Sequence, residues 1–153
     1  MKDVSAATTI QTSDKRQTVE TSKIVSATLV GMVVAVVVNV VLWAVMQFVL
    51  QMNLQISLGG PGTPMEPLPV LPVIVLTVLP ALVAGALFWL LTRFTSRPHT
   101  IFLVVALIVL VVSLIAPFGA FPGFLMNAIG LNVMHIGAAL PIMWALLTRT
   151  RAS

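Results

Sequence analysis

The sequence predicts an all-α, polytopic membrane protein in which four transmembrane helices form an up-down bundle. Three observations support this fold class. Hydrophobic residues make up 59% of the 153 residues, charged residues make up only 8%, and the apolar residues gather in four long runs. Soluble domains carry about 25% charged residues, because their surfaces face water. Most of the surface of this chain is therefore predicted to face hydrocarbon.

The apolar runs divide the chain into three parts. Residues 1–23 are rich in Thr, Ser and Gln without an apolar period, and we interpret them as a disordered cytoplasmic tail. Residues 24–148 are predicted to form the transmembrane domain, and residues 149–153 a short cytoplasmic end. The predicted helices cover residues 24–50, 70–92, 100–116 and 124–147. A bilayer core of about 30 Å requires about 20 helical residues, so runs of this length can span it.

Glycine and proline interrupt the helical pattern between and within the runs. The stretch GGPGTP breaks residues 51–69, and we interpret this segment as a connecting loop. The Lys and the Ser or Thr that a phosphate-binding loop requires are missing from it. Pro80 and Pro141 fall within the second and fourth helices and are expected to kink them, which membrane spans tolerate. Pro117 and Pro122 are expected to bracket the third connection.

The basic residues predict how the helices are oriented. They lie near the ends of the apolar runs: Lys2, Lys15, Arg16, Lys23, Arg93, Arg97, Arg149 and Arg151. If four helices cross, all of these cations lie on one face, and the only charge on the other face is Glu66. Lys and Arg are in excess on the cytoplasmic side of membranes, so we expect both termini in the cytoplasm and a multi-pass protein of the plasma (inner) membrane. The cations form no continuous basic patch, so nucleic acid is not an expected partner.

Two similar segments are predicted to anchor helices at the membrane surface. The second run ends in WLLTR, with Trp89 and Arg93, and the fourth ends in WALLTR, with Trp144 and Arg149. Trp prefers the level of the lipid headgroups, and Arg extends its side chain toward the phosphates. Both segments should therefore leave the membrane on the same face.

Small and polar residues are predicted to hold the helices together. Lipid is as apolar as Leu, so helices associate in it through close packing and interhelical hydrogen bonds. Helical spacing aligns three sets of such residues: Gly31, Ala35 and Asn39; Thr77, Ala81 and Gly85; and Ala128, Asn132, His135 and Ala139. Each set would allow two backbones to approach.

The deep polar residues supply a candidate site. They are Asn39, Gln47, Thr77, Ser113, Asn127, Asn132 and His135. An unpaired polar group in hydrocarbon costs several kcal/mol, so we expect these side chains to face inward and bond one another. Asn39 and His135 both fall near mid-span. We select Asn39, Ser113, Asn132 and His135 as the candidate intramembrane polar cluster.

Three short segments resemble a known family. The first helix carries NVVLWAV, the third ends in SLIAPF, and the fourth carries VMHIGAALPI. Together they resemble a bacterial four-helix membrane family catalogued as domain of unknown function 6069, over residues of about 24 to 147. Asn39, Ser113, Pro117 and His135 fit its pattern. The resemblance implies an architecture, since the family has no established activity.

Two interpretations of His135 remain open. Ionisable residues inside a membrane are costly, so a role as a proton relay or ligand-binding group is one of them. The other is a neutral donor and acceptor that ties the fourth helix to the first or third. No carboxylate lies within any run to stabilise a charged ring. We therefore expect a neutral imidazole and favour packing.

The sequence predicts no catalytic, cofactor-binding or metal site. The chain has no Cys, and the other histidine, His99, lies at the end of a run. Met126, Met134 and Met143 are not spaced to converge on one point, as a soft-metal site requires. Glu66 is the only acid beyond the tail, so no carboxylate pair is available for acid–base chemistry. We expect a protein that is not an enzyme.

Three functions are compatible with these features. The favoured one is a non-enzymatic helical bundle that acts as a scaffold or accessory subunit. The second is a small oligomeric carrier or proton-coupled permease, and the third a protein that binds a lipid or quinone between its helices. The expected partners are membrane lipids, with further copies of the chain or an unidentified membrane protein.

Overall fold

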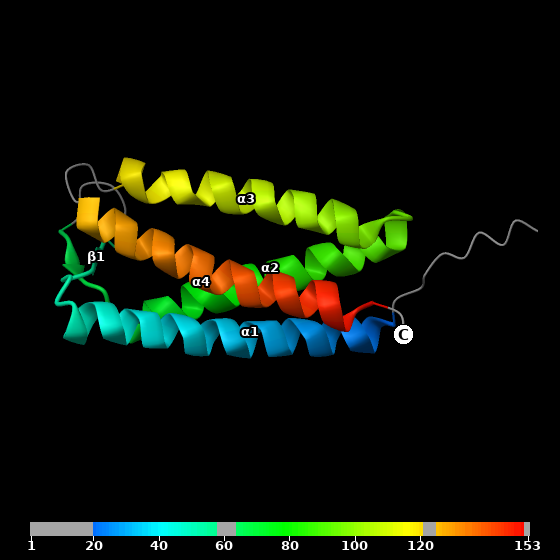
Figure 1. The fold of residues 1–153 in the computed structure, drawn as a ribbon, viewed down its shortest axis with the longest axis horizontal. Helices are drawn as coiled ribbons and strands as arrows, with labels where there is room; N and C mark the ends of the chain where they lie inside the picture. Colours follow the sequence, from blue (N-terminus) through cyan, green and yellow to red (C-terminus); the bar gives the residue numbers. More distant parts are fainter. Residues whose placement is uncertain (1–19, 58–63, 121–124, 152–153) are drawn as a thin grey trace, which may run out of the picture.

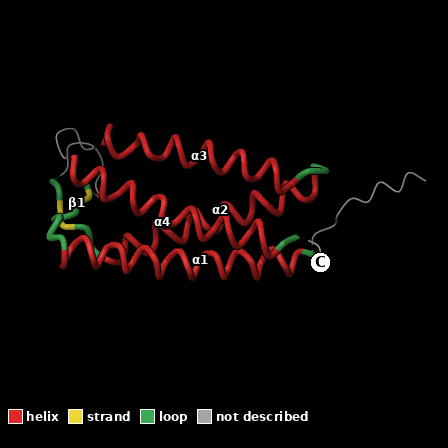
Figure 2. The backbone as a smooth tube through the Cα atoms, viewed as in Figure 1, coloured by secondary structure: helices red, strands yellow, loops and turns green. Residues whose placement is uncertain are grey.

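The computed structural model is an up-down bundle of four helices with a small two-stranded sheet at one end (Figure 1). It describes residues 20–57, 64–120 and 125–151. The elements are α1 (Thr21–Ala44), the π-helical turn η1 (Val45–Val49), β1 (Gln55–Ile56), β2 (Glu66–Pro67), α2 (Val70–Phe94), α3 (Pro98–Ala120) and α4 (Leu125–Arg149). Helix dominates the backbone, as Figure 2 shows. All four long helices are apolar and long enough to cross a membrane, which confirms the predicted fold class.

The helices differ from the predicted ranges mainly at their ends. The expected tail lies largely outside the described residues, but its last residues, from Thr21, already belong to α1. The expectation that Pro117 ends the third helix is wrong, because α3 continues through it to Ala120. Proline removes one helical N–H, and membrane helices tolerate this loss. Pro122 lies outside the described residues.

The chain reverses direction after η1 through two residues with positive φ. The N–H of Leu50 donates to the Val45 carbonyl at 2.9 Å, and the N–H of Met52 donates to the Met46 carbonyl at 2.9 Å. Gln51 and Asn53 have φ values of 50° and 46°. This left-handed backbone ends helices by satisfying their last carbonyls while turning the chain. The segment that follows is therefore directed back over the end of the bundle.

The described part of the 51–69 loop forms a cap over that end. Strands β1 and β2 pair antiparallel, with Gln55 opposite Pro67 and Ile56 opposite Glu66. Next to them, the N–H of Leu68 donates to the Leu54 carbonyl at 2.7 Å. Leu54 and Leu68 are 0% and 2% exposed. The described part of the loop is thus a folded element as well as a connection, stabilised by two buried leucines.

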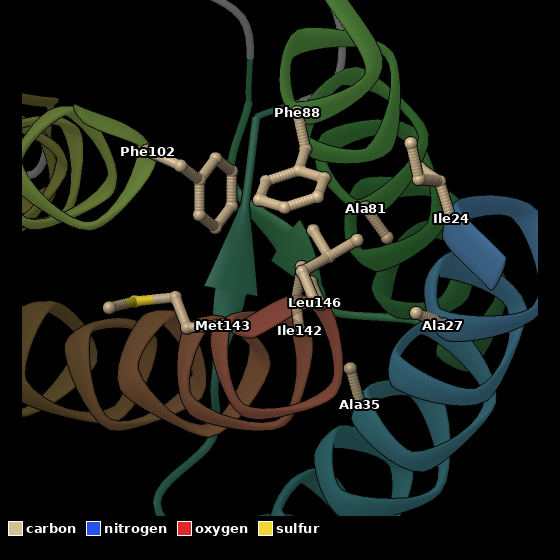
Figure 3. Close-up of a cluster of buried hydrophobic side chains, with 9 residues drawn as sticks. All are labelled: Ile24, Ala27, Ala35, Ala81, Phe88, Phe102, Ile142, Met143 and Leu146. Atoms are coloured by element: carbon tan, nitrogen blue, oxygen red, sulfur yellow. The ribbon is translucent and has the colours of Figure 1, made fainter. Parts of the chain in front are cut away.

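Helices α1, α2 and α4 form the tight part of the bundle. α1 packs most extensively against α4 and then against α2. Figure 3 shows the main apolar cluster between the helices, made of Ile24, Ala27, Ala35, Ala81, Phe88, Phe102, Ile142, Met143 and Leu146. Several members are alanines, which allows the backbones of α1 and α2 to approach each other and α4.

Helix α3 lies at the edge of the bundle and packs mainly against α4, with a second contact to α2 near its beginning. Its Phe102 packs edge-on against Phe88 of α2, with ring centroids 5.2 Å apart. Val109, two turns farther along, is 60% exposed, whereas Pro117 near the end of the helix is buried again. Figure 1 shows that α2 and α3 leave their shared connection in diverging directions. Of the four spans, α3 is therefore the least buried, although it remains in contact with α4 and α2.

Candidate functional site

Asn39 forms the central polar contact of the bundle. The side chain is 4% exposed, and its Nδ2 donates to the Thr77 hydroxyl of α2 at 2.9 Å. That hydroxyl donates its own hydrogen to the Val73 carbonyl at 2.7 Å. Thr77 is thus satisfied as both acceptor and donor. The stripe of Thr77, Ala81 and Gly85 on α2 faces α1, so small size and hydrogen bonding operate on the same helix face.

The oxygen of Asn39 faces α4 at a glycine. Asn39 Oδ1 is buried and has no hydrogen-bond partner among the described residues. A Cβ atom placed on Gly137 would come within 2.9 Å of this oxygen and 2.6 Å of Leu42 Cδ1. A side chain at residue 137 would therefore displace the Asn39 amide and the Leu42 side chain at this contact. Gly137, which we did not single out from the sequence, completes the contact between the two helices.

His135 does not bond Asn39. Its side chain is exposed, and Nδ1 lies 2.8 Å from the Leu131 carbonyl of its own helix. A carbonyl only accepts, so Nδ1 carries the hydrogen in this bond, and in a neutral ring Nε2 is left as an acceptor. The expectation that His135 faces inward and ties α4 to another helix is therefore wrong.

The other two members of the predicted cluster also stand apart. Ser113 is half-buried and donates to the Leu110 carbonyl of its own helix at 2.7 Å. Asn132 is half-buried, and its Oδ1 has no hydrogen-bond partner among the described residues. Of the four selected residues, Asn39 alone makes an interhelical hydrogen bond within the described ranges, and its partner is Thr77.

The polar residues nevertheless share a similar depth. Phe102 of α3 contacts Phe88 of α2. Counting the same number of residues forward from Phe102 and back from Phe88 leads to Ser113 and Thr77, which therefore lie at a similar depth. His99 Nε2 of α3 lies 2.9 Å from the Oγ1 of Thr150, the residue that follows α4. Counting from His99 forward to Ser113, and the same number of residues back from Thr150 along α4, leads to the region of His135. The sequence therefore indicated the level of these groups along the bundle, but not the faces they occupy.

The cap supplies a second set of polar contacts, on the other side of the bundle from the termini. Asn127 near the start of α4 holds the backbone of Gln55: its Oδ1 accepts from the N–H at 2.8 Å and its Nδ2 donates to the carbonyl at 3.1 Å. The indole Nε1 of Trp43 donates to the Leu68 carbonyl at 2.9 Å. The sequence did not predict either of these side-chain bonds to the loop, because bonds to a loop backbone leave no periodic pattern.

The predicted anchors lie together at the end of the bundle that carries the start of α1 and the end of α4. The guanidinium of Arg93 lies 5.1 Å from the centroid of the Trp89 ring, and that of Arg149 lies 5.9 Å from the Trp144 ring. Such contacts combine a cation with an aromatic face. In the described ranges, Lys23, Arg93, Arg97, Arg149 and Arg151 are all at this end, whereas Glu66 lies in the cap.

Acidic and metal-ligating side chains are sparse in this structure. Among residues 20–57, 64–120 and 125–151, no three His, Cys, Asp or Glu side chains come together. The polar groups that do converge are amides, hydroxyls and backbone carbonyls. Their chemistry is that of neutral hydrogen bonding between helices.

These features define a class, a multi-pass membrane protein built as a four-helix bundle. A family model described as a family of unknown function (DUF6069) matches residues 19–152, and the chain belongs to that family. The match includes every helix of the bundle and confirms the resemblance inferred from the three short segments. No curated protein and no solved structure matches the chain.

Proposed function

We propose that this chain is a non-enzymatic scaffold or accessory subunit of a bacterial plasma membrane, with α3 as the helix that contacts its partner. One observation carries the proposal. Helix α1 packs closely against α4 at Gly31 and against α2 at Gly85, whereas α3 leaves most of its apolar surface unpaired within the chain. A helix that buries so little of its apolar surface in its own chain is suited to contacting another helix.

The outward face of α3 carries an ordered stripe of branched side chains. Val104, Ile108, Val111 and Ile115 recur at helical spacing and are 50%, 58%, 61% and 66% exposed. β-branched side chains have few rotamers in a helix, so packing them against a neighbour costs little side-chain entropy. Helix association in lipid depends on such van der Waals packing. The stripe therefore suits a transmembrane helix of another subunit or of a second copy.

A small oligomeric carrier or proton-coupled permease is the second candidate, and His135 favours it. An imidazole on an exposed helix face near mid-depth leaves Nε2 available as an acceptor. Several copies would be needed to enclose a pathway around it. Proteoliposomes in which a pH-dependent solute flux disappears with His135→Leu would support this candidate over the scaffold.

Site-specific photo-crosslinking in native membranes tests the scaffold proposal. A benzophenone side chain at Val111 on α3 is compared with one at Val37 on α1, and the two residues are 61% and 57% exposed. We expect a protein adduct from the α3 position and only lipid adducts from the α1 position. Absence of a protein adduct at Val111, or equal adducts at both positions, would show that α3 is no partner surface.

The proposed orientation is tested with single cysteines, since the chain has none of its own. Both termini in the cytoplasm would place Ser96, between α2 and α3, inside the cell and Pro64, beside β2, outside it. Both residues are exposed. In intact cells, a membrane-impermeant maleimide should label Pro64→Cys and leave Ser96→Cys unmodified until the cells are lysed. The reverse pattern would reject the orientation.

A further inference from the structure

A shallow pocket lies between the beginning of α1 and the end of α4. It measures about 440 Å³ and is lined by Ser22, Lys23, Ser26 and Arg149. We propose that this pocket binds the phosphate of an anionic phospholipid, whose acyl chains lie along α1. The inference is independent of the partner proposed for α3, because it concerns another part of the molecule.

The lining of the pocket has the chemistry that a phosphodiester requires. Two cations from opposite ends of the sequence, Lys23 and Arg149, converge on it together with two hydroxyl groups. Guanidinium groups bind phosphate through parallel N–H donors, and an ammonium group adds a compact charge. No acidic residue lines the pocket, and the described residues show no ion pair with either cation. Within the described part of the chain, the two positive charges are therefore available to an external anion.

The pocket lies at the depth of the lipid headgroups. The span that contains α1 and η1 has 29 residues, which corresponds to about 44 Å of helix. The hydrocarbon core is about 30 Å thick, so roughly one turn at each end projects beyond it. Ser22 and Lys23 lie in the first such turn. Trp144, whose ring lies 5.9 Å from the Arg149 guanidinium, is an aromatic residue of the kind found at this boundary.

The surface that continues from the pocket into the membrane is apolar. Ser22, Ser26, Leu29 and Val33 follow one another on one face of α1 at helical spacing. Leu29 and Val33 are 48% and 57% exposed. A molecule that places a phosphate between Lys23 and Arg149 can therefore lay hydrocarbon chains along the same helix. A lipid matches both the basic pocket and the apolar face of α1, whereas a soluble phosphate matches only the pocket.

The chain contains a natural control for this site. Arg93 has the same arrangement as Arg149: it lies over a tryptophan, near the end of a helix, at the same end of the bundle. It does not line the pocket. Arg93→Gln and Arg149→Gln therefore remove the same charge and the same type of cation–aromatic contact, and only Arg149→Gln removes a pocket residue.

Native mass spectrometry of the full chain in detergent provides the test, with phosphatidylglycerol and phosphatidylcholine as probes. We expect preferential retention of phosphatidylglycerol. Loss of one charge-assisted contact should weaken that retention about tenfold in Arg149→Gln and in Lys23→Gln. Arg93→Gln should match the unaltered protein, and Arg149→Lys should keep part of the affinity. Circular dichroism and size-exclusion profiles establish that each variant is folded.

Three outcomes would overturn the inference. Equal retention of the two lipids would show that the phosphate site does not select charge. An equal loss in Arg93→Gln would show general attraction to the basic end of the bundle. Binding of inorganic phosphate, measured by calorimetry, without retention of phosphatidylglycerol would identify a soluble anion as the ligand instead.

Discussion

Helix α4 packs against α1 on one side and α3 on the other, and the two contacts are built differently. Toward α1, the backbones meet at glycines: a Cβ on Gly31 would lie 3.0 Å from Ala145 Cβ and 3.1 Å from Ile142 Cα. Helix α3 buries less of its surface: Val109 is 60% exposed, and Ser113 is only half-buried. α3 is the most apolar of the four spans and also the least buried. In lipid, small side chains therefore predict burial better than hydrophobicity does.

Among the changes that test this comparison, enlarging Gly31 is expected to lower the stability of the protein most. Gly31→Leu must displace the backbone of α4 at Ile142, and overpacking of this kind costs typically 1–3 kcal/mol. The matched change is Gly119→Leu on α3, where a Cβ would meet no atom within 4 Å. Thermal unfolding in detergent should show a clear loss of stability for residue 31 and none for residue 119. Equal losses of stability would mean that Gly31 in the α1–α4 contact is packed no more tightly than Gly119 on α3.

Removing the hydrogen bond between Asn39 and Thr77 should lower the free energy of unfolding by a smaller amount. A double-mutant cycle with Asn39→Ala and Thr77→Ala isolates the coupling between the two side chains, and bonds of this type in membranes average about 0.6 kcal/mol. The free energy of unfolding in mixed micelles is the quantity to measure. A coupling of zero would indicate that close packing alone joins α1 to α2.

The tight part of the bundle was the more predictable from sequence. The lengths of the apolar runs gave the four helices, and the small stripes on α1 and α2 gave the faces that meet. The third stripe shows the limit, since His135 shares an arc with Ala139 and is nevertheless exposed. Residue spacing fixes the depth of a side chain, because a helix rises by a constant step. The face that becomes buried depends on how the neighbouring helices diverge.

The cap shows a second limit. Leu54 and Gln55 belong to a loop without helical or strand-length periodicity, so nothing in the pattern predicted that Asn127 holds the Gln55 backbone. Pro117 shows a third, since proline near the end of an apolar run ends a helix in one protein and is accommodated in another. In each case, the outcome depends on contacts between segments that lie far apart in the sequence.

The smallest effects are expected for Ser113 of α3 and His135 of α4. Ser113 and His135 bond only carbonyls of their own helices within the described residues. Ser113→Ala and His135→Leu remove no interhelical bond, so each should change the free energy of unfolding by less than about 0.5 kcal/mol. Chemical denaturation in micelles measures this directly. A loss as large as that of Asn39→Ala would show that α3 and α4 are coupled through these groups, and the contrast between the two sides of α4 would then fail.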